Sequence, residues 1–303
     1  MGTPEFAVPS LDILVQNNYD IIAVVTSTDS YGGRGGKQLI ESSIKKYAIE
    51  HHIPVLQPTN LKSPGFIEQL KSFEADLQVV VAFRMLPEVV WNMPPLGTFN
   101  LHGSLLPRYR GAAPINHAII QGETETGVTS FKLKHEIDTG DVLLQKKVPV
   151  YENDDAGILH DRMMNAGAEV VLETVKLIES GKYTFLKQDD SLATKAPKIF
   201  HETCKIDFKK PVDQVYNFIR GLSPYPGAWC VLEGKEIKLL KTKKRMFTDD
   251  NEAGTIVTDH KKSLEIKCKD GYIQVISLKP QGKKEMSVID FLNGNKIVAT
   301  SII

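Results

Sequence analysis

The fold is decided most directly by residues 99–114, which read FNLHGSLLPRYRGAAP. The stretch opens inside an apolar run at 96–102, LGTFNLH, which is typical of a buried strand in a parallel sheet. It then turns through a glycine into a loop that carries Arg108 and Arg110. A connecting loop needs glycine and proline for its backbone, but it does not need an asparagine, a histidine and two cations. The mixture therefore indicates a functional loop at the end of a strand.

Strands and helices alternate over the first two-thirds of the chain. Short apolar runs predict strands at 20–26, 53–58, 77–83, 96–102, 127–133 and 141–150. Apolar residues at helical spacing predict helices from Pro9 onward and at 41–52, 63–73, 114–122 and 155–181. This alternation implies an α/β domain with a Rossmann-like, mainly parallel sheet, which we assign to residues 1–188.

The first strand of that sheet is missing from the sequence pattern. The chain begins at Met1 directly on GTPEF, which looks like the loop that follows such a strand. A parallel sheet without a central strand would leave backbone groups unpaired. We therefore expect the natural protein to begin a few residues upstream, with a short apolar run ahead of Met1.

A second domain is expected after a linker. Residues 189–208 are polar and irregular and predict the linker. A short helix is expected at 211–222, and strand candidates follow near 228–232, 235–242, 254–258, 264–268 and 272–278. Five short strands separated by glycine and Asp/Asn clusters suit a small OB-like β-barrel, which we assign to residues 209–303.

The net charge of zero conceals an asymmetry between the two parts. Residues 209–303 hold 17 Lys and Arg against 11 Asp and Glu, a net charge of +6, so residues 1–208 carry −6. A basic C-terminal part suggests an anionic partner such as nucleic acid. Alternatively, the lysines only keep a small β domain soluble, and charge alone slightly favours this second explanation.

The composition points to a cytoplasmic protein with reduced thiols. No stretch approaches the ~18 apolar residues that span a bilayer, and no signal peptide is apparent. Cys204, Cys230 and Cys268 are odd in number and widely spaced, so they fit neither a disulfide framework nor a zinc site.

Asn100 and His102 are the first candidates for chemistry. Alternate residues of a strand project to the same face, and ligands bind at the carboxyl ends of strands in open α/β sheets. An amide and an imidazole aimed at one point can stabilise an oxyanion and move a proton. The alternative is that the two side chains only satisfy nearby backbone groups. The pair, followed by a glycine turn, favours function.

A carboxylate partner is offered by the stretch HEIDTGDVLL at 135–144. Either Asp138 or Asp141 could orient His102 or accept a proton. Asp and Gly also favour plain turns, so a structural turn is the alternative. Together with His135 the two carboxylates could be interpreted as metal ligands, but no further His or Cys ligand lies nearby in the sequence, and we expect no metal.

The residues at 99–114 together with DTGD resemble the 10-formyltetrahydrofolate-dependent formyltransferases. The resemblance extends through GTPEFAVPSL, GRGGK, ATKAPKI and IRGLSPYPGAW and so covers nearly the whole chain. It implies that 1–188 is a formyltransferase catalytic domain in which Asn100 holds the formyl oxygen, His102 stabilises the oxyanion, and Asp138 assists removal of a proton from the attacking amine. It also implies 10-formyltetrahydrofolate as the donor, bound by the loop Ser104, Leu105, Leu106 and Pro107, without a metal.

GTPEF, the Arg34 loop and the basic C-terminal barrel resemble the branch of the family that formylates initiator methionyl-tRNA in translation initiation. The resemblance implies that the loop at 26–39 contacts the acceptor arm, and the residues expected on tRNA are Arg34, Lys37, Lys241, Lys243 and Lys244. Judged on its glycines alone, this loop could cradle a phosphate or be a plain surface connector. We expect a monomer without a protein partner.

Other acceptors and another class of protein compete with this interpretation. Transferases that act on glycinamide ribonucleotide usually lack a C-terminal barrel, and those that act on a UDP-linked amino sugar resemble the chain less in GTPEF and around Arg34. A non-catalytic RNA-binding protein would not need Asn100, His102 and Asp138 together.

Overall fold

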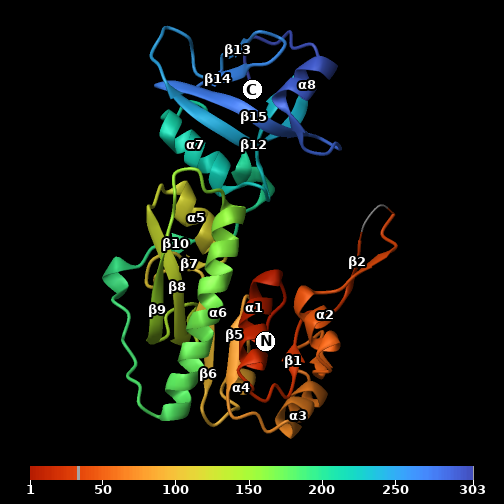
Figure 1. Cartoon of the computed structure of the whole chain (residues 1–303), viewed down its shortest axis with the longest axis vertical. Helices are drawn as coiled ribbons and strands as arrows, with labels where there is room; N and C mark the ends of the chain where they lie inside the picture. Colours follow the sequence, from red (N-terminus) through yellow and green to blue (C-terminus); the bar gives the residue numbers. More distant parts are fainter. Residues whose placement is uncertain (33–34, 303) are drawn as a thin grey trace. The chain divides into compact units, whose positions relative to one another are not determined.

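The computed structural model describes residues 1–32 and 35–302 and divides the chain into two compact units (Figure 1). The first unit comprises Met1–Gly111, Thr126–Val148 and His160–Lys195. The second comprises Ala112–Glu125, Pro149–Leu159 and Ala196–Ile303. Two short segments from the middle of the chain therefore fold with the C-terminal part, while the boundaries at 188 and 208 remain a prediction.

The first unit is built on the expected α/β sheet. Parallel pairs join β1 (Val24–Val25) to β4 (Val55–Leu56) and β5 (Gln78–Val81) to β6 (Thr98–His102). Beyond β6 the order continues to β8 (Glu125–Lys132) and β9 (Val142–Pro149), and β8 runs antiparallel to β6. The pairs β1–β4 and β5–β6 are therefore parallel, whereas the pair β6–β8 is antiparallel.

Met1 and Gly2 occupy the position of the first strand. The Gly2 amide donates to the Val25 carbonyl over 3.0 Å, and the Val81 amide donates to the Met1 carbonyl over 2.9 Å. Gly2 also forms a parallel bridge to Val81, so these two residues connect β1 to β5. A Cβ at Gly2 would lie 2.6 Å from the Cβ of Ala7, so only glycine fits between them. The gap expected from the sequence is thus spanned by two residues.

Four helices of the first unit follow the predicted apolar spacing. They are α1 (Val8–Gln16), α2 (Ser43–Glu50), α3 (Pro64–Ser72) and α6 (Ala156–Ser180), whose first residues belong to the second unit. The short helix α4 (Glu88–Trp91) was not predicted. The Ser42 hydroxyl accepts the Lys45 amide and caps α2. α6 lies against the sheet, because the Thr174 hydroxyl donates to Ser130 of β8 over 2.7 Å.

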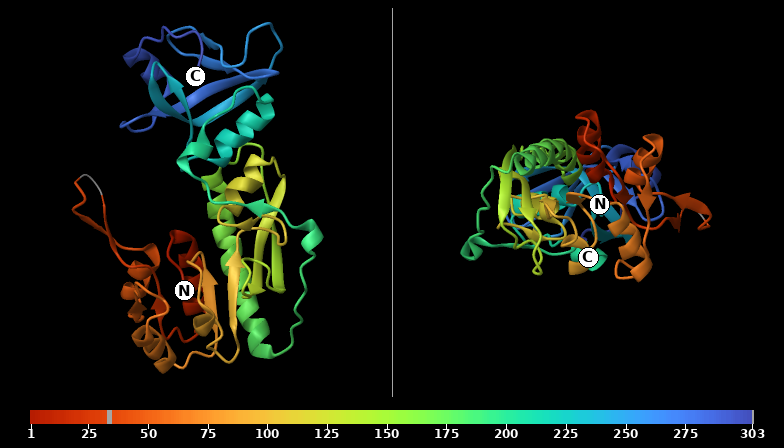
Figure 2. Two further views of the ribbon diagram at one scale, coloured as in Figure 1. Left: turned by 180° about the vertical axis from the view of Figure 1, so that it is seen from behind. Right: turned by 90° about the horizontal axis from the view of Figure 1, so that it is seen from below.

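A hairpin stands in the stretch that the sequence predicted to be a glycine-rich loop. β2 (Ser30–Gly32) and β3 (Gln38–Ile40) pair antiparallel, with Tyr31 opposite Leu39. Both of these side chains are exposed, and the hairpin extends away from the rest of the first unit (Figures 1 and 2). The glycine pairs around Arg34 give no alternation of apolar and polar residues, so the sequence pattern did not predict this hairpin.

The second unit contains a six-stranded antiparallel sheet in the order β11-β12-β15-β14-β13, with β16 on β15. Its elements are α5 (Pro114–Ile120), α7 (Val212–Gly221), β11 (Ala228–Leu232), β12 (Lys235–Met246), β13 (Ile256–Thr258), β14 (Leu264–Lys267), β15 (Gly271–Pro280), β16 (Met286–Ser287) and α8 (Val288–Gly294). A separate two-stranded sheet pairs β7 (Arg110–Gly111) of the first unit with β10 (Lys195–Ala196). The five predicted strands and the predicted helix are all present. Between residues 196 and 302, no pairing joins β11 to β13, so the sheet forms a half-barrel instead of a closed barrel.

The core of the second unit contains all three cysteines as free thiols. Burial raises the pKa of Cys230 and of Cys268 to about 12, so neither thiol is reactive at neutral pH. Throughout the ranges that the structure describes, no helix is both long enough and apolar enough to cross a bilayer.

Candidate functional site

Asn100 and His102 lie where the sequence predicted, at the carboxyl end of the buried strand β6. The flanking Phe99 and Leu101 are buried in the interior, so alternation places the asparagine and the histidine on the same face. His102 is 6% exposed, whereas Asn100 is half-buried. The strand therefore presents an amide with access to solvent beside a largely buried imidazole.

The hydrogen bonds of His102 determine its tautomer. Its Nε2 lies 2.8 Å from the carbonyl oxygen of Tyr109, and a carbonyl can only accept, so Nε2 carries the hydrogen. The Nδ1 atom of the neutral ring then holds a lone pair, and it lies 3.6 Å from Oδ2 of Asp138. Two acceptors facing each other are held favourably only when a proton is shared between them or donated by a third group. This geometry suits a step in which a substrate N–H is deprotonated.

Asp138 is held in place by a hydrogen bond from the stretch 99–114. Its Oδ2 accepts the Gly111 amide over 2.8 Å, and its backbone adopts φ +57°, a conformation that is unfavourable for a side chain with a Cβ. Asp141, the alternative candidate, instead accepts Lys134 Nζ over 2.8 Å through Oδ1. Asp138 is therefore the carboxylate that pairs with His102.

The loop between these two carboxylates is anchored to β8. A Cβ at Gly140 would lie only 1.6 Å from the carbonyl oxygen of Lys132, so the chain can pass this close to the strand only with glycine. The close approach to Lys132 therefore explains why a glycine stands at position 140 in DTGD.

Gln188 is a buried residue of the site that the sequence did not reveal. Its Nε2 donates to the carbonyl oxygens of Asp138 over 2.9 Å and of Gly140 over 2.7 Å. Its Oε1 accepts from Nε and Nη2 of Arg110 over 3.1 and 2.7 Å. One of the two unexplained arginines of the opening stretch is thereby tied to the Asp138 loop. Gln188 lies at the border of the predicted polar linker, where nothing distinguished it from other polar residues.

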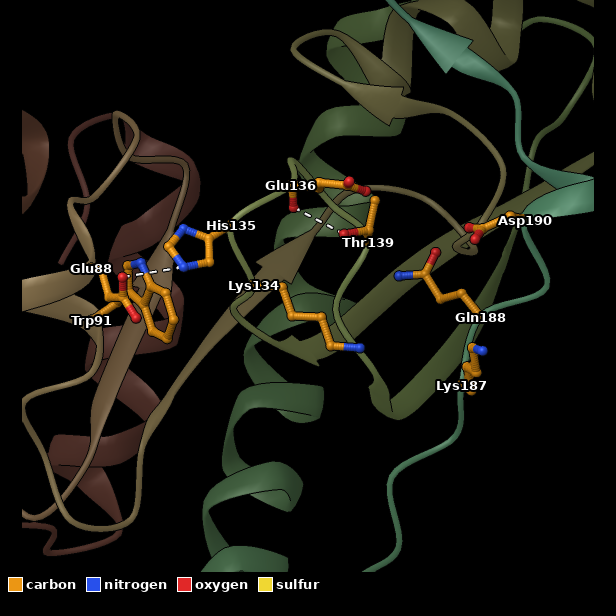
Figure 3. Close-up of a pocket in the computed structure, with 9 residues that line it drawn as sticks. All are labelled: Glu88, Trp91, Lys134, His135, Glu136, Thr139, Lys187, Gln188 and Asp190. Atoms are coloured by element: carbon orange, nitrogen blue, oxygen red, sulfur yellow. Dashed lines mark hydrogen bonds and ion pairs between the residues drawn. The ribbon is translucent and has the colours of Figure 1, made fainter.

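A pocket of about 420 Å³ adjoins this loop in the first unit (Figure 3). Trp91 and His135 supply aromatic rings, Glu88 pairs with His135 over 3.1 Å, and Lys134 and Lys187 supply cations. None of Asn100, His102 and Asp138 lines the pocket. It reaches the Asp138 loop through Thr139, and Gln188, which bonds that loop, also lines it.

Family models match both parts of the chain. The model described as "Formyl transferase" matches residues 1–175, and "Formyl transferase, C-terminal domain" matches residues 198–296. The chain belongs to the formyl transferase family.

Close relatives within the formyl transferase family match over almost their entire length. A protein of Parabacteroides distasonis named methionyl-tRNA formyltransferase is 50% identical over 309 residues, which cover 99% of this chain and 95% of the relative. A protein of the same name from Flavobacterium johnsoniae is 50% identical over 299 residues, covering 97% and 94%.

Solved structures of lower identity share the fold of this formyl transferase family member. The N-formyltransferase from Helicobacter canadensis, in complex with folinic acid and dTDP-3-aminofucose, gives a TM-score of 0.69 at 20% identity, covering 94% of this chain and 97% of that one. HypX from Aquifex aeolicus in complex with tetrahydrofolic acid gives 0.60 at 20% identity, covering 81% and 43%.

In this formyl transferase family member, side chains of the loop predicted to bind folate are already engaged in contacts within the protein. The Ser104 hydroxyl is buried and donates to the Arg108 carbonyl over 2.6 Å, and the Leu106 side chain packs in a buried cluster with Phe131. Leu105 and Pro107 are half-buried. Any contact with a ligand therefore falls to the main chain and to these two side chains, and the folate assignment of 104–107 stays a prediction.

The predicted tRNA residues of this formyl transferase family member differ in their surroundings. Lys37, Lys241 and Lys243 are exposed, whereas Lys244 pairs with Asp213 over 2.7 Å and with Glu152 over 3.3 Å. Arg34 lies outside the described residues.

No metal-binding group is apparent at the site. Across residues 1–32 and 35–302, no cluster of three His, Cys, Asp or Glu side chains could hold a metal ion, and the metal-free assignment remains a prediction.

Proposed function

We propose that this protein transfers the formyl group of 10-formyltetrahydrofolate to the α-amino group of methionyl-tRNA, and that Asn100, His102 and Asp138 perform the chemistry. One observation supports the reaction above all: Nδ1 of His102 lies 3.6 Å from the Asp138 carboxylate while Nε2 lies 2.8 Å from the Tyr109 carbonyl oxygen. The acceptor is inferred from relatives about 50% identical over 93–95% of their length that are named methionyl-tRNA formyltransferase.

Each of the three side chains has its own role in the transfer. When the amine nitrogen attacks the formyl carbon, negative charge develops on the formyl oxygen, and the Asn100 amide stabilises it by donating a hydrogen bond. The attacking nitrogen must lose a proton, which passes to His102 Nδ1 with Asp138 stabilising the imidazolium that forms. The imidazolium donates hydrogen bonds on both sides, to Tyr109 through Nε2 and toward Asp138 through Nδ1. As the carbon–nitrogen bond to the donor breaks, the same proton is available to the departing nitrogen.

The pocket beside the Asp138 loop fits a reduced folate. Such a donor combines a flat bicyclic ring bearing hydrogen-bond donors with a glutamate tail bearing carboxylates, and it supplies an activated formyl group. Trp91 offers an aromatic surface, Glu88 and Glu136 offer acceptors, and Lys134 and Lys187 offer cations to the tail. A volume of about 420 Å³ accommodates a bicyclic ring.

The basic residues of both units are proposed to contact the nucleic acid. Lys241 and Lys243 are exposed on β12 of the C-terminal half-barrel and would contact phosphates. Lys244 contributes less, because two carboxylates already neutralise it. Arg34 and Lys37 are proposed to reach the acceptor arm.

A competition between acceptors tests the proposal. The protein is incubated with formyl-labelled 10-formyltetrahydrofolate and equal amounts of methionyl-tRNA, glycinamide ribonucleotide and a nucleotide-linked amino sugar. We expect label on methionyl-tRNA and none on the other two acceptors. Label on the amino sugar or on the ribonucleotide, with none on the tRNA, would assign a different acceptor.

A further inference from the structure

We infer that Gln188 is a positioning residue that holds the Asp138 carboxylate in register with His102. This role rests on the function proposed above. The side chain is 7% exposed and bonds to two carbonyl groups of the loop that carries the aspartate, so it fixes the backbone from which that carboxylate projects.

The loop needs such support because Asp138 is strained. Its backbone φ of +57° lies in the left-handed region, which a residue with a Cβ adopts at an energetic cost and keeps only when its surroundings hold it there. Two hydrogen bonds hold Asp138: Gln188 Nε2 donates to its carbonyl oxygen, and the Gly111 amide donates to its Oδ2. Without the bond from Gln188 the backbone can relax, and the Asp138 carboxylate then moves away from both the Gly111 amide and His102.

Gln188 acts through the loop and not on the ligand. Both hydrogens of its amide are used by carbonyl oxygens, and its Oε1 already accepts two N–H groups of Arg110. Although it lines the pocket proposed for the donor, no hydrogen-bonding capacity remains for a bound molecule. Its removal should therefore lower kcat and leave the KM for the donor nearly unchanged.

Two substitutions separate the loop from the arginine. Gln188→Ala removes every bond of the amide. Gln188→Glu keeps an acceptor for Arg110 but has no N–H to offer to Asp138 and Gly140, and it places a negative oxygen against their carbonyls. If the loop matters, both variants should lower kcat by about 10- to 100-fold, the usual cost of a small misplacement of a catalytic group. Asp189→Asn is the matched control, because Asp189 is an exposed neighbour whose side chain bonds Ser191 and not the Asp138 loop.

Amide hydrogen exchange reports the carboxylate position without any turnover. The Gly111 amide is protected by Asp138 Oδ2, whereas the adjacent Arg110 amide is protected by the Thr194 carbonyl at 2.9 Å. In both Gln188 variants we expect faster exchange at Gly111 and unchanged exchange at Arg110. A general loosening of the segment would accelerate both amides.

The outcomes separate cleanly. Slow turnover in both variants, an unchanged donor KM and selective exposure of the Gly111 amide support the inference. A Gln188→Glu protein with near-native kcat would show that the residue works through Arg110, and equal loss of protection at Arg110 would show a merely structural role; either overturns it. If the unmodified protein formylates no methionyl-tRNA, the proposed function fails, but the Gly111 readout still tests the placement of Asp138.

Discussion

Replacing Asp138 by asparagine tests the proton-transfer role with little change in shape. Asparagine can keep the acceptor that receives the Gly111 amide, since one amide oxygen can take the place of Oδ2. That oxygen would still face Nδ1 of His102, because Oδ2 is also the atom that lies 3.6 Å from it, but an amide oxygen carries no negative charge. No negative charge therefore remains to stabilise the imidazolium that forms when Nδ1 receives the proton. Proton transfer by a positioned group contributes about 10²–10⁴ in rate, equivalent to about 3–5 kcal/mol of barrier, and we expect this loss in Asp138→Asn.

The assay is single-turnover formylation of methionyl-tRNA with saturating donor, accompanied by a measurement of donor binding. Asp141→Asn is the comparison, because Asp141 belongs to the same loop but forms a partly exposed ion pair with Lys134 that contributes little. We expect donor binding to be retained in Asp138→Asn and turnover to be nearly normal in Asp141→Asn. A near-native rate in Asp138→Asn, or an equal loss in the two variants, would refute the assignment of the proton path.

Three further predictions concern the donor, the tRNA and acid stability. Trp91→Ala should raise the KM for 10-formyltetrahydrofolate about two- to tenfold by removing ~0.5–1.5 kcal/mol of ring stacking. An unchanged KM would show that the donor does not bind in this pocket. Arg34→Ala should lower kcat/KM for methionyl-tRNA about 10- to 100-fold, whereas Lys241→Ala should mainly reduce the salt slope of binding by about one. An unchanged kcat/KM in Arg34→Ala would contradict the first role, and an unchanged salt slope in Lys241→Ala would contradict the second. The Tyr272 hydroxyl and then Lys267 lower the pKa of Asp249 from 3.8 to about 2, so its stabilising contribution is complete above pH 4 and is lost as the pH falls toward 2. Acid unfolding should therefore be less steep between pH 4 and 2 in Asp249→Asn, and a superimposable curve would rule this contribution out.

The sequence predicted the alternation of elements and the catalytic strand because these follow from local patterns. Apolar runs and helical spacing depend only on neighbouring residues, so β5, β6, α6 and the five main strands of the second unit were found close to their observed bounds. Asn100 and His102 share a face because side chains alternate along any strand. The choice between Asp138 and Asp141 could not be made in the same way, since it depends on which carboxylate the loop turns toward His102.

The features that the sequence missed depend on contacts between distant segments. Gln188 is separated from Asp138 by 50 positions and lies in a polar stretch, so its burial became apparent only in three dimensions. Met1 and Gly2 are too short to register as a strand, yet their backbone groups pair with β1 and β5. The closure of the C-terminal sheet likewise depends on strand curvature, and five short strands in sequence suit a half-barrel as well as a barrel.

The central claim is that the His102 imidazole catalyses formyl transfer to the amine of methionyl-tRNA. The most direct test is a single-turnover reaction of the unmodified protein and of His102→Ala with labelled formyl donor, followed by release and mass analysis of the amino acid from the tRNA. We predict N-formylmethionine from the unmodified protein and a rate at least ~10²–10³-fold lower from His102→Ala at unchanged donor binding. Formylation by His102→Ala at a near-native rate, or the absence of N-formylmethionine from the unmodified protein, would contradict the account.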